Sequence, residues 1–441
     1  MSHATTTDAA RPARPTLSDH IGALVDRDSY VPAAASSADA AVYASDGAAQ
    51  TAEGGEALID GRPVTVGLAG HILPRALALR HPYVAISSGT GGLARGGRRD
   101  LGVLDPVWGM SGGPMLAEMC ARQRSIPVVS ALVRHSFGDA TFFTGLSDFV
   151  VQLRGTCMAL TSPRVLAVGT SERVTMEELG GVDVHRRNGQ ADVIADTLDD
   201  VYLAIRRFLS YLPSHAGAPL PVTVARPPAA GALADGVPGP GDARRLIARL
   251  LDEDSFFELK PDYAPSLVTG LARLDGVPVG VLANDPSAAD SADADGAYSA
   301  DACQKAARLV CSCDAFGLPL LFLVDSPGPR TEPSAAVSRA MTLAQAIELA
   351  EVPKCWVLTR RAFGTGLLIT GPARVATDLV LAWPGARTGY YDDPAAQPGA
   401  PDGVVAPVDT RARLAAHLRA VLGPAPVSRP GRTLRTWPVA W

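Results

Sequence analysis

The chain has 441 residues, of which 47% are hydrophobic and 19% charged, and these proportions are typical of a globular protein of about two domains. Its net charge of −5 and the lack of a basic tract argue against nucleic acid as a partner. No apolar run approaches the ~20 residues that span a bilayer, and residues 1–15 lack the apolar core of a signal peptide. We therefore expect a cytoplasmic protein with no membrane partner.

The six cysteines, at positions 120, 157, 303, 311, 313 and 355, form no pair of CxxC knuckles. A zinc ribbon needs two such knuckles, so we expect no metal site and interpret the thiols as buried or incidental.

In the first half, a disordered tail at residues 1–15 precedes an amphipathic helix at 17–25 and an Ala/Ser/Gly-rich loop at 33–56. The Asp60-Gly61 pair between two apolar segments predicts a β-hairpin. A buried strand at 83–86 runs into the Gly-rich stretch 87–92, which we predict to be a ligand-facing loop. The remaining predicted elements are helices at 115–123 and 197–212 and strands at 126–133 and 148–153.

The Pro-, Gly- and Ala-rich stretch 214–242 is predicted to link an N-terminal domain (16–213) to a C-terminal domain (243–441). The C-terminal half repeats the order of elements of the first. We predict a hairpin at 272–282, helices at 304–316 and 335–351, and strands at 320–324 and 352–359. Strands that alternate with helices in two similar halves indicate α/β domains with mostly parallel pairing.

Two motifs recur at one long offset. Phe137-Gly138 and Phe363-Gly364 each follow an apolar run, and 226 residues (363 minus 137) separate them. The same offset carries Leu-Val-Asp-Arg-Asp-Ser-Tyr at 24–30 onto Leu-Leu-Asp-Glu-Asp-Ser-Phe at 250–256. Unrelated stretches would not be expected to share this offset, so we interpret the chain as an internal duplication.

The repeated Phe-Gly turns suggest a chemistry. A strand that enters a helix through a Gly turn leaves backbone N–H groups that can hold an oxygen anion, such as the enolate of a thioester. A plain strand-to-helix turn, in which Gly serves only the backbone angles, is the alternative for a single copy. Two equivalent copies favour paired oxyanion sites. A P-loop is set aside because neither Gly-rich loop continues into Gly-Lys-Ser/Thr.

Further motifs are more specific. Residues 174–181 are Val-Thr-Met-Glu-Glu-Leu-Gly-Gly, followed by His185 and by Leu-Ser-Tyr-Leu-Pro at 209–213. The second half has Lys-Ala-Ala-Arg at 305–308, Cys-Asp-Ala-Phe at 313–316, Val-Asp-Ser-Pro-Gly at 324–328 and Leu-Ala-Trp-Pro at 381–384. Together they resemble the carboxyltransferase (β) subunits of biotin-dependent acyl-CoA carboxylases, the propionyl-CoA carboxylase β type, across residues 17–420. We interpret His185 as a structural residue beside the Gly180-Gly181 turn.

The resemblance implies two tandem crotonase-like (ClpP/crotonase superfamily) α/β domains. It also implies an active site between the N-half of one subunit and the C-half of another, hence a homo-oligomer. The N-half turn at Gly138 and Asp139 would hold the thioester oxygen, and the C-half turn at Thr365 and Gly366 the carboxybiotin carbonyl. The implied substrate-binding residues are Ser88, Gly89, Thr90, Gly91 and Phe137.

The implied reaction converts acetyl- or propionyl-CoA to malonyl- or methylmalonyl-CoA, which are precursors of fatty acids or polyketides. The sequence contains no Met-Lys-Met biotinylation site and no ATP-binding loop. Acyl-CoA is therefore the expected substrate, no cofactor is expected to be bound covalently, and carboxybiotin is expected on a carrier that works with a separate biotin carboxylase.

Two departures from the family keep other functions open. Asp139 replaces a glycine, and a carboxylate 4 Å from an enolate costs about 4 kcal/mol at an effective dielectric of 20. Asp139 would then turn away as a helix cap or serve, with a raised pKa, as a proton donor, a role that His135 could also take. The segment after Trp383-Pro384 is also shortened. Alternatives are a biotin-independent decarboxylase of malonyl-type thioesters on CoA or acyl carrier protein, and a non-catalytic partner subunit.

Overall fold

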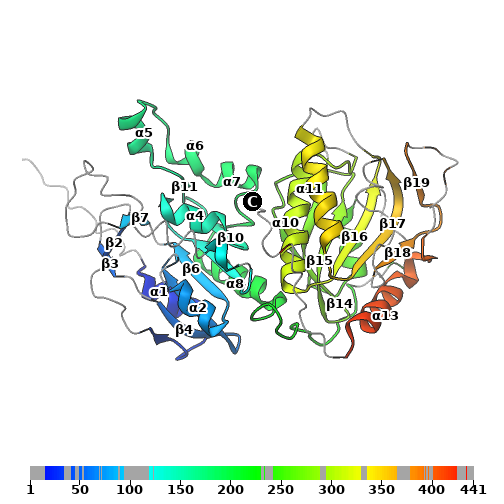
Figure 1. Cartoon of the computed structure of the whole chain (residues 1–441), viewed down its shortest axis with the longest axis horizontal. Helices are drawn as coiled ribbons and strands as arrows, with labels where there is room; N and C mark the ends of the chain where they lie inside the picture. Colours follow the sequence, from blue (N-terminus) through cyan, green and yellow to red (C-terminus); the bar gives the residue numbers. More distant parts are fainter. Residues whose placement is uncertain are drawn as a thin grey trace, which may run out of the picture.

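The computed structural model describes residues 15–33, 41–44, 49–51, 54–68, 70, 72–87, 90–93, 119–122, 124–229, 233, 242–288, 295–328, 335–364, 378–391, 393, 396, 401–424 and 434. Within these residues the chain forms two halves, each built on a large β-sheet, that pack side by side (Figure 1).

The N-half sheet contains seven strands among the described residues. In spatial order they are β1 (Val31–Pro32), β4 (Gly54–Ile59), β5 (Arg62–Leu68), β6 (Tyr83–Ser87), β8 (Val128–Leu132), β10 (Phe149–Leu153) and β12 (Val193–Ala195). β1, β4 and β5 are antiparallel neighbours, and the pairs from β5 to β12 are parallel. β6 and β8 are buried on both faces, as parallel strands covered by helices must be.

The C-half sheet repeats this arrangement. Its described strands are β13 (Phe257–Leu259), β14 (Leu267–Leu274), β15 (Val277–Asn284), β16 (Leu320–Ser326), β17 (Lys354–Phe363), β18 (Leu379–Ala382) and β20 (Gly403–Val404), with β19 (Arg387–Gly389) beside the end of β17. The first three strands are antiparallel neighbours and the following pairs are parallel.

The strand registers confirm the duplication. Tyr83 of β6 lies opposite Val128 of β8, and Leu320 of β16 lies opposite Lys354 of β17. Asp148 then accepts a hydrogen bond from the Val128 N–H at 2.9 Å, and Asp378 accepts one from the Lys354 N–H at 3.1 Å. Val128 and Lys354 are separated by the same offset as Phe137 and Phe363, so the two sheets share their register as well as their order.

Both predicted hairpins are present and turn in the same way. Asp60 and Gly61 have φ of 50° and 74°, and Asp275 and Gly276 have φ of 55° and 81°. A type I′ turn requires positive φ at both central residues, which Asp-Gly tolerates better than other pairs. The hairpin signal in the sequence was therefore purely local.

A second, smaller sheet lies in the N-half. Its described strands are, in order, β11 (Met158–Ala159), β9 (Ser136–Phe137), β7 (Thr90–Leu93), β2 (Ala41–Ala44) and β3 (Ala49–Thr51). Two predictions were wrong here, because 33–56 is not a continuous loop and the end of the 87–92 loop is strand β7. The Ala/Ser/Gly composition carries no alternation, and β2 gains order by pairing with β7, which is distant in sequence.

The predicted helices at 17–25, 197–212, 304–316 and 335–351 are present. They are α1 (Leu17–Leu24), α8 (Leu198–Tyr211), α10 (Ala300–Phe316) and α11 (Ala335–Leu349). Among the described residues, the other helices of more than seven residues are α9 (Ala243–Leu250) and α13 (Thr410–Leu422). Thr197 caps α8 by accepting from the Asp200 N–H, and α8 buries one face against β10. In the part of the chain that the structure describes, no helix is long and apolar enough to cross a membrane.

The two halves share one hydrophobic core. Phe149 of β10 stacks on Phe208 of α8 at 4.4 Å between ring centroids and also contacts Phe257 of β13. Arg207 of α8 donates to the Phe256 carbonyl at 2.7 Å. The described part of the predicted linker packs on the C-half hairpin, since the Thr223 N–H donates to the Gly276 carbonyl. The domain boundaries remain predictions.

Candidate active site

The candidate site of the N-half is the turn where β9 enters α4 (Asp139–Gly145). Gly138 lies between them with φ of 68° and ψ of −133°, a conformation that L-residues with a side chain rarely adopt. A glycine is therefore required by the backbone at the centre of the predicted oxyanion turn.

Strand β11 holds this turn in place. Met158 lies opposite Ser136 and Ala159 opposite Phe137, and the Gly138 N–H donates to the Leu160 carbonyl at 3.2 Å. The Gly138 N–H is thus used within the protein, and the next N–H along the turn belongs to Asp139, the first residue of α4. The side chain of Asp139 lies outside what the structure describes.

Strand β7 brings a second predicted segment to the turn. Gly91 pairs with Phe137, so Thr90 and Gly91 lie on the strand next to the Phe-Gly turn. The predicted binding residues Thr90, Gly91, Phe137 and Gly138 are therefore together in the fold. Ser88 and Gly89 lie outside the described residues.

His135, the other predicted proton donor, is half-buried just before β9. Its Nδ1 accepts a hydrogen bond from the Cys157 N–H at 3.1 Å, and its ring stacks on Phe137. Because Nδ1 is an acceptor, a neutral His135 carries its proton on Nε2. The ring therefore joins the turn to the segment that leads into β11.

The C-half turn has the same construction. Gly364 follows Phe363 with φ of 54°, and its N–H donates to the Gly389 carbonyl of β19 at 2.9 Å, as the Gly138 N–H does to Leu160. A Cβ on Gly328 would lie 3.1 Å from the Phe363 carbonyl oxygen, so the predicted loop after β16 packs tightly against this turn. Thr365 and Gly366, the predicted donors, lie outside the described residues.

A charged cluster beside the C-half turn was missed by the sequence reasoning. Asp325 of β16 accepts from Arg360 Nε at 2.7 Å and from Arg361 Nε at 2.9 Å, and Arg361 also pairs with Asp295. Hydrogen bonds to these carboxylates raise the pKa of the half-buried Arg361 further. The sequence showed two adjacent arginines before Phe363, but the strand register was needed to place them on Asp325.

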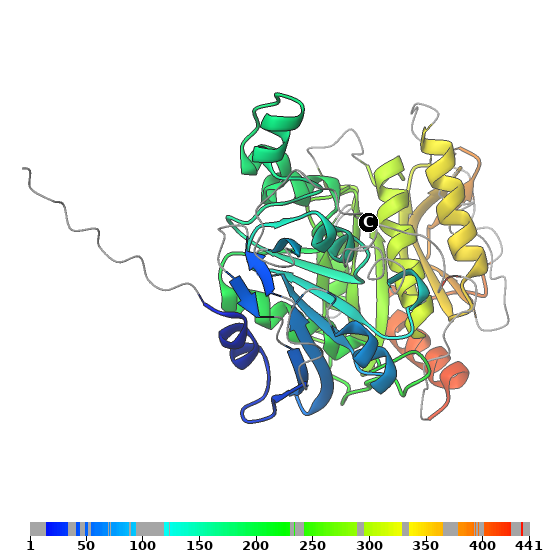
Figure 2. The same ribbon diagram turned by 60° about the vertical axis from the view of Figure 1, so that its left-hand side comes forward.

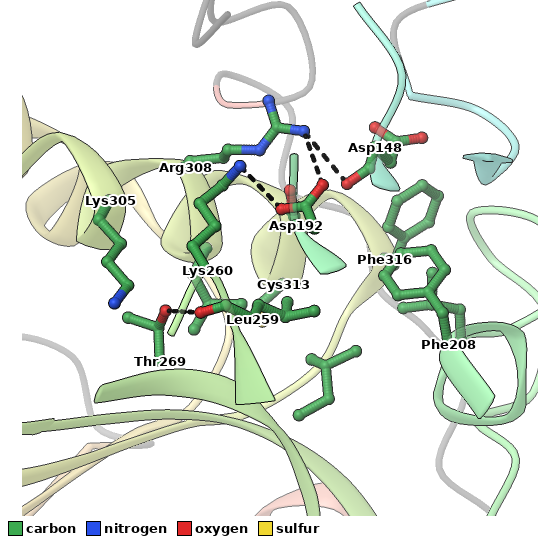
Figure 3. Close-up of a pocket in the computed structure, with 14 residues that line it drawn as sticks. Asp148, Asp192, Phe208, Leu259, Lys260, Thr269, Lys305, Arg308, Cys313 and Phe316 are labelled. Carbon is green, nitrogen blue, oxygen red and sulfur yellow. Dashed lines mark hydrogen bonds and ion pairs between the residues drawn. The ribbon is translucent and has the colours of Figure 1, made fainter. Parts of the chain in front are cut away.

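A separate cavity of about 30 Å³ lies between the halves, and Asp192, Lys260, Lys305, Arg308 and Phe316 are among its lining residues (Figure 3). None of the predicted site residues lines it. Lys260 pairs with Asp192 at 2.9 Å, and burial lowers the pKa of Lys260 to about 8. We interpret the cavity as part of the packed interface rather than as a substrate site.

Comparison with known proteins assigns the chain to a family. Residues 25–392 match the model of the carboxyl transferase domain family, and the chain belongs to this family. The chain is 33% identical to a biotin-dependent acetyl-/propionyl-coenzyme A carboxylase beta5 subunit of Mycobacterium leprae, over 71% of this chain and 58% of that protein. It is 30% identical to a propionyl-CoA carboxylase carboxyltransferase subunit of Haloferax mediterranei, over 79% of this chain and 75% of that protein.

A solved structure of transcarboxylase 12S, with hydrolysed methylmalonyl-coenzyme A bound, superposes with a TM-score of 0.78 at 26% identity, and the match covers 92% of this chain and 89% of that one. The prediction of two tandem crotonase-like domains is thereby confirmed. The chain spans 53% and 58% of the length of the first two curated relatives it matches.

Proposed function

We propose that this chain is an acyl-CoA carboxyltransferase that moves a carboxyl group between carboxybiotin on a separate carrier and a short acyl-CoA such as acetyl- or propionyl-CoA. The observation that carries the proposal is the pair of equivalent turns in a member of this family. Gly138 and Gly364 each have positive φ, and their N–H groups donate to the carbonyls of Leu160 and Gly389, respectively. The proposal is also supported by the transcarboxylase 12S neighbour, which has hydrolysed methylmalonyl-coenzyme A bound.

In the proposed mechanism the thioester lies beside β7 and β9. The Asp139 N–H and backbone groups of the 88–91 segment stabilise the negative charge that develops on the thioester oxygen when the α-carbon loses a proton. Because Gly138 and Gly91 have no side chains, the thioester can come close to the backbone here. The fixed position of β9 against β11 means that these donors need no reorganisation during the reaction.

The C-half turn would hold the carboxyl donor. Gly328 and Gly389 pack closely against Phe363, and the Gly364 N–H donates to the Gly389 carbonyl, so the backbone around this turn is held in place. Carboxybiotin, when bound, supplies the CO2. Within this chain the Asp325 cluster joins β16 to β17 at the register shift between these strands, close to the turn.

A second candidate function is biotin-independent decarboxylation of a malonyl-type thioester on CoA or a carrier protein. It passes through the same enolate and needs a proton donor, for which Asp139 and His135 are the candidates. The segment after Trp383-Pro384, shortened relative to the family, supports it, because in the family this segment helps to form the biotin side of the site.

One experiment separates the candidates. The purified protein is incubated with malonyl-CoA and with methylmalonyl-CoA, and loss of the carboxyl group is followed by mass. Turnover by the protein alone, abolished by Asp139→Ala, supports the decarboxylase. No turnover alone, with acyl-CoA carboxylation after addition of ATP, bicarbonate, a biotin carboxylase and biotinylated carrier, supports the transferase. No reaction in either assay supports the non-catalytic partner subunit.

We also propose that the protein forms a homo-oligomer. Helices α5 (Pro163–Gly169) and α6 (Met176–Gly180) project from the body of the N-half, and α5 has no buried residue (Figure 2). Val165 and Val168 are 52% and 83% exposed there. Such a helix gains stability mainly by packing, so a second copy is the expected cover. The transcarboxylase 12S structure is described as a hexamer assembly.

A further inference from the structure

The segment from Thr156 to Leu160 is the support of the N-half turn. Its strand β11 pairs with β9, the Cys157 carbonyl accepts from the Ser136 N–H at 2.8 Å, and the Leu160 carbonyl accepts from the Gly138 N–H. Any displacement of this segment therefore moves Gly138 and the N–H of Asp139, which is the proposed donor to the thioester oxygen.

On its other side the segment is held by His185 of α7 (Val182–Asn188). His185 is 5% exposed, and its Nδ1 lies 2.8 Å from Gln152 Oε1. Gln152 Nε2 in turn donates to the Thr156 carbonyl at 3.1 Å, which fixes the orientation of the amide. The imidazole thus holds the Thr156 end of the bend before β11 through the Gln152 amide.

The Gly-Gly end of the 174–181 motif packs against the same segment, Thr156 to Leu160. A Cβ on Gly180 would lie 2.0 Å from the Met158 carbonyl oxygen, so α6 approaches β11 more closely than any side chain allows. Thr175 and Glu178 form a capping box that starts α6. The motif and His185 therefore both hold the segment that supports the N-half turn.

We propose that His185 is a positioning residue for the thioester-binding turn, acting through Gln152, Thr156 and strand β11 on Gly138 and Asp139. The proposal rests on the function proposed above. Burial lowers the pKa of His185 to about 4, so the ring stays neutral at physiological pH and is not a proton donor to substrate. Its role is geometric, and a displacement of about 1 Å at a reacting centre can lower a rate about 100-fold.

The test compares three variants. His185→Leu removes the hydrogen bonds, and His185→Asn keeps a donor near the position of Nδ1. His20→Leu is the matched control, because His20 is equally buried and bonds Tyr202 Oη at 2.7 Å, on α1 and away from the turn. We expect His185→Leu to lower kcat of carboxyl transfer about ten- to 100-fold with KM changed less than about threefold. His185→Asn should recover most of the rate, and His20→Leu should lower Tm alone.

Hydrogen exchange gives a second readout that does not need activity. Amides at 136–138 and 157–160 should exchange faster in His185→Leu than in the wild type and in His20→Leu. Equal kcat and equal exchange in His185→Leu and His20→Leu would overturn the proposal. If His185→Leu does not fold, Gln152→Leu removes the same hydrogen bond from the other side. An inactive wild type would refute the proposed function, and the exchange data would still decide the role of His185.

Discussion

Asp26 and Asp252 hold the two Asp-Gly hairpins of the molecule by the same contacts. Asp26 accepts hydrogen bonds from the N–H groups of Asp60 at 3.0 Å and Gly61 at 2.7 Å. Asp252 accepts from the N–H groups of Asp275 and Gly276, both at 2.8 Å. Each carboxylate also pairs with an arginine of a later helix. Asp26 pairs with Arg206 of α8 at 3.2 Å, and Asp252 pairs with Arg411 of α13 at 2.7 Å. The duplicated motif therefore has one structural role in each half.

Asp26 and Asp252 differ in burial, so we expect their removal to lower the free energy of unfolding by different amounts. The Asp26 side chain is 29% exposed and the Asp252 side chain 2% exposed. We expect Asp252→Ala to lower the free energy of unfolding by about 3–5 kcal/mol, because it leaves buried N–H groups and Arg411 without their acceptor. Asp26→Ala should cost about 1–2 kcal/mol. Urea unfolding of both variants measures the difference, and equal losses would show that the burial difference does not matter.

The buried ion pair between the halves gives a second prediction. Lys260 and Asp192 are 4% and 3% exposed, so Lys260→Met removes the nearer cation of a buried carboxylate and leaves only Arg308, at 3.6 Å. The expected loss in the free energy of unfolding is about 3 kcal/mol. Arg154→Met is the matched control: Arg154 pairs with Asp196, but their side chains are 57% and 71% exposed, and the expected cost is below about 1 kcal/mol. Similar midpoints in urea for both variants would contradict this account.

Gly180 should tolerate no side chain. Gly180→Ala places a Cβ against the Met158 carbonyl, and α6 or β11 must shift to relieve the contact. We expect a loss of about 2 kcal/mol in stability and a fall in kcat larger than the change in KM. Gly169→Ala, in α5, meets no atom within 4 Å and should be neutral or slightly stabilising. Thermal unfolding and steady-state kinetics on both variants check this, and an active, stable Gly180→Ala would refute it.

His185 should make stability depend on pH. Its pKa is lowered from 6.5 to about 4 in the folded state, chiefly by burial, so the unfolded state takes up the proton first as the pH falls. The free energy of unfolding therefore decreases between pH 6.5 and 4, by about 2 kcal/mol at pH 5 from this group alone. His185→Asn leaves every carboxylate of the protein unchanged but removes the titrating imidazole. The variant therefore loses only this contribution to the pH dependence. Urea unfolding at pH 7.5 and 5 should show the smaller drop in the variant, and parallel drops would contradict the neutral, buried ring.

The projecting helix α5 gives a prediction on assembly. Val168→Glu places a charge on an exposed apolar surface and should leave the fold intact, since Val168 is 83% exposed. If α5 packs on a second copy, the variant should sediment as a smaller species with unchanged circular dichroism. Leu203→Glu, also on an exposed position at 64%, is the control on α8. An unchanged oligomer for Val168→Glu would exclude α5 from the interface.

The sequence was sufficient where the signal is local. The Asp60-Gly61 and Asp275-Gly276 pairs predicted the two turns that the structure shows, and the repeated motifs predicted its duplication. It failed where pairing with distant segments creates the structure, as in β2 and β7, whose Ala- and Gly-rich residues have little strand propensity of their own. The contacts of Asp325 with Arg360 and Arg361 depend on the register of β16 and β17, which no local pattern specifies.

The candidate site was predicted in part for the same reason. The Phe-Gly turns could be found because they repeat, whereas the pairing of Gly91 with Phe137 could be found only in the structure. The support of the turn by His185 and Gln152 could not be found, because these two residues are 33 positions apart and meet only when α7 packs on β10.

The most direct test of the proposed function follows the carboxyl group itself. Methylmalonyl-CoA labelled in its free carboxyl group is mixed with the full-length protein and a biotinylated carrier, without ATP or bicarbonate. The account predicts that the label moves to the carrier and returns to propionyl-CoA when unlabelled propionyl-CoA is added in excess. Label lost as CO2 in the absence of carrier, or label that stays on methylmalonyl-CoA with carrier present, would contradict carboxyl transfer.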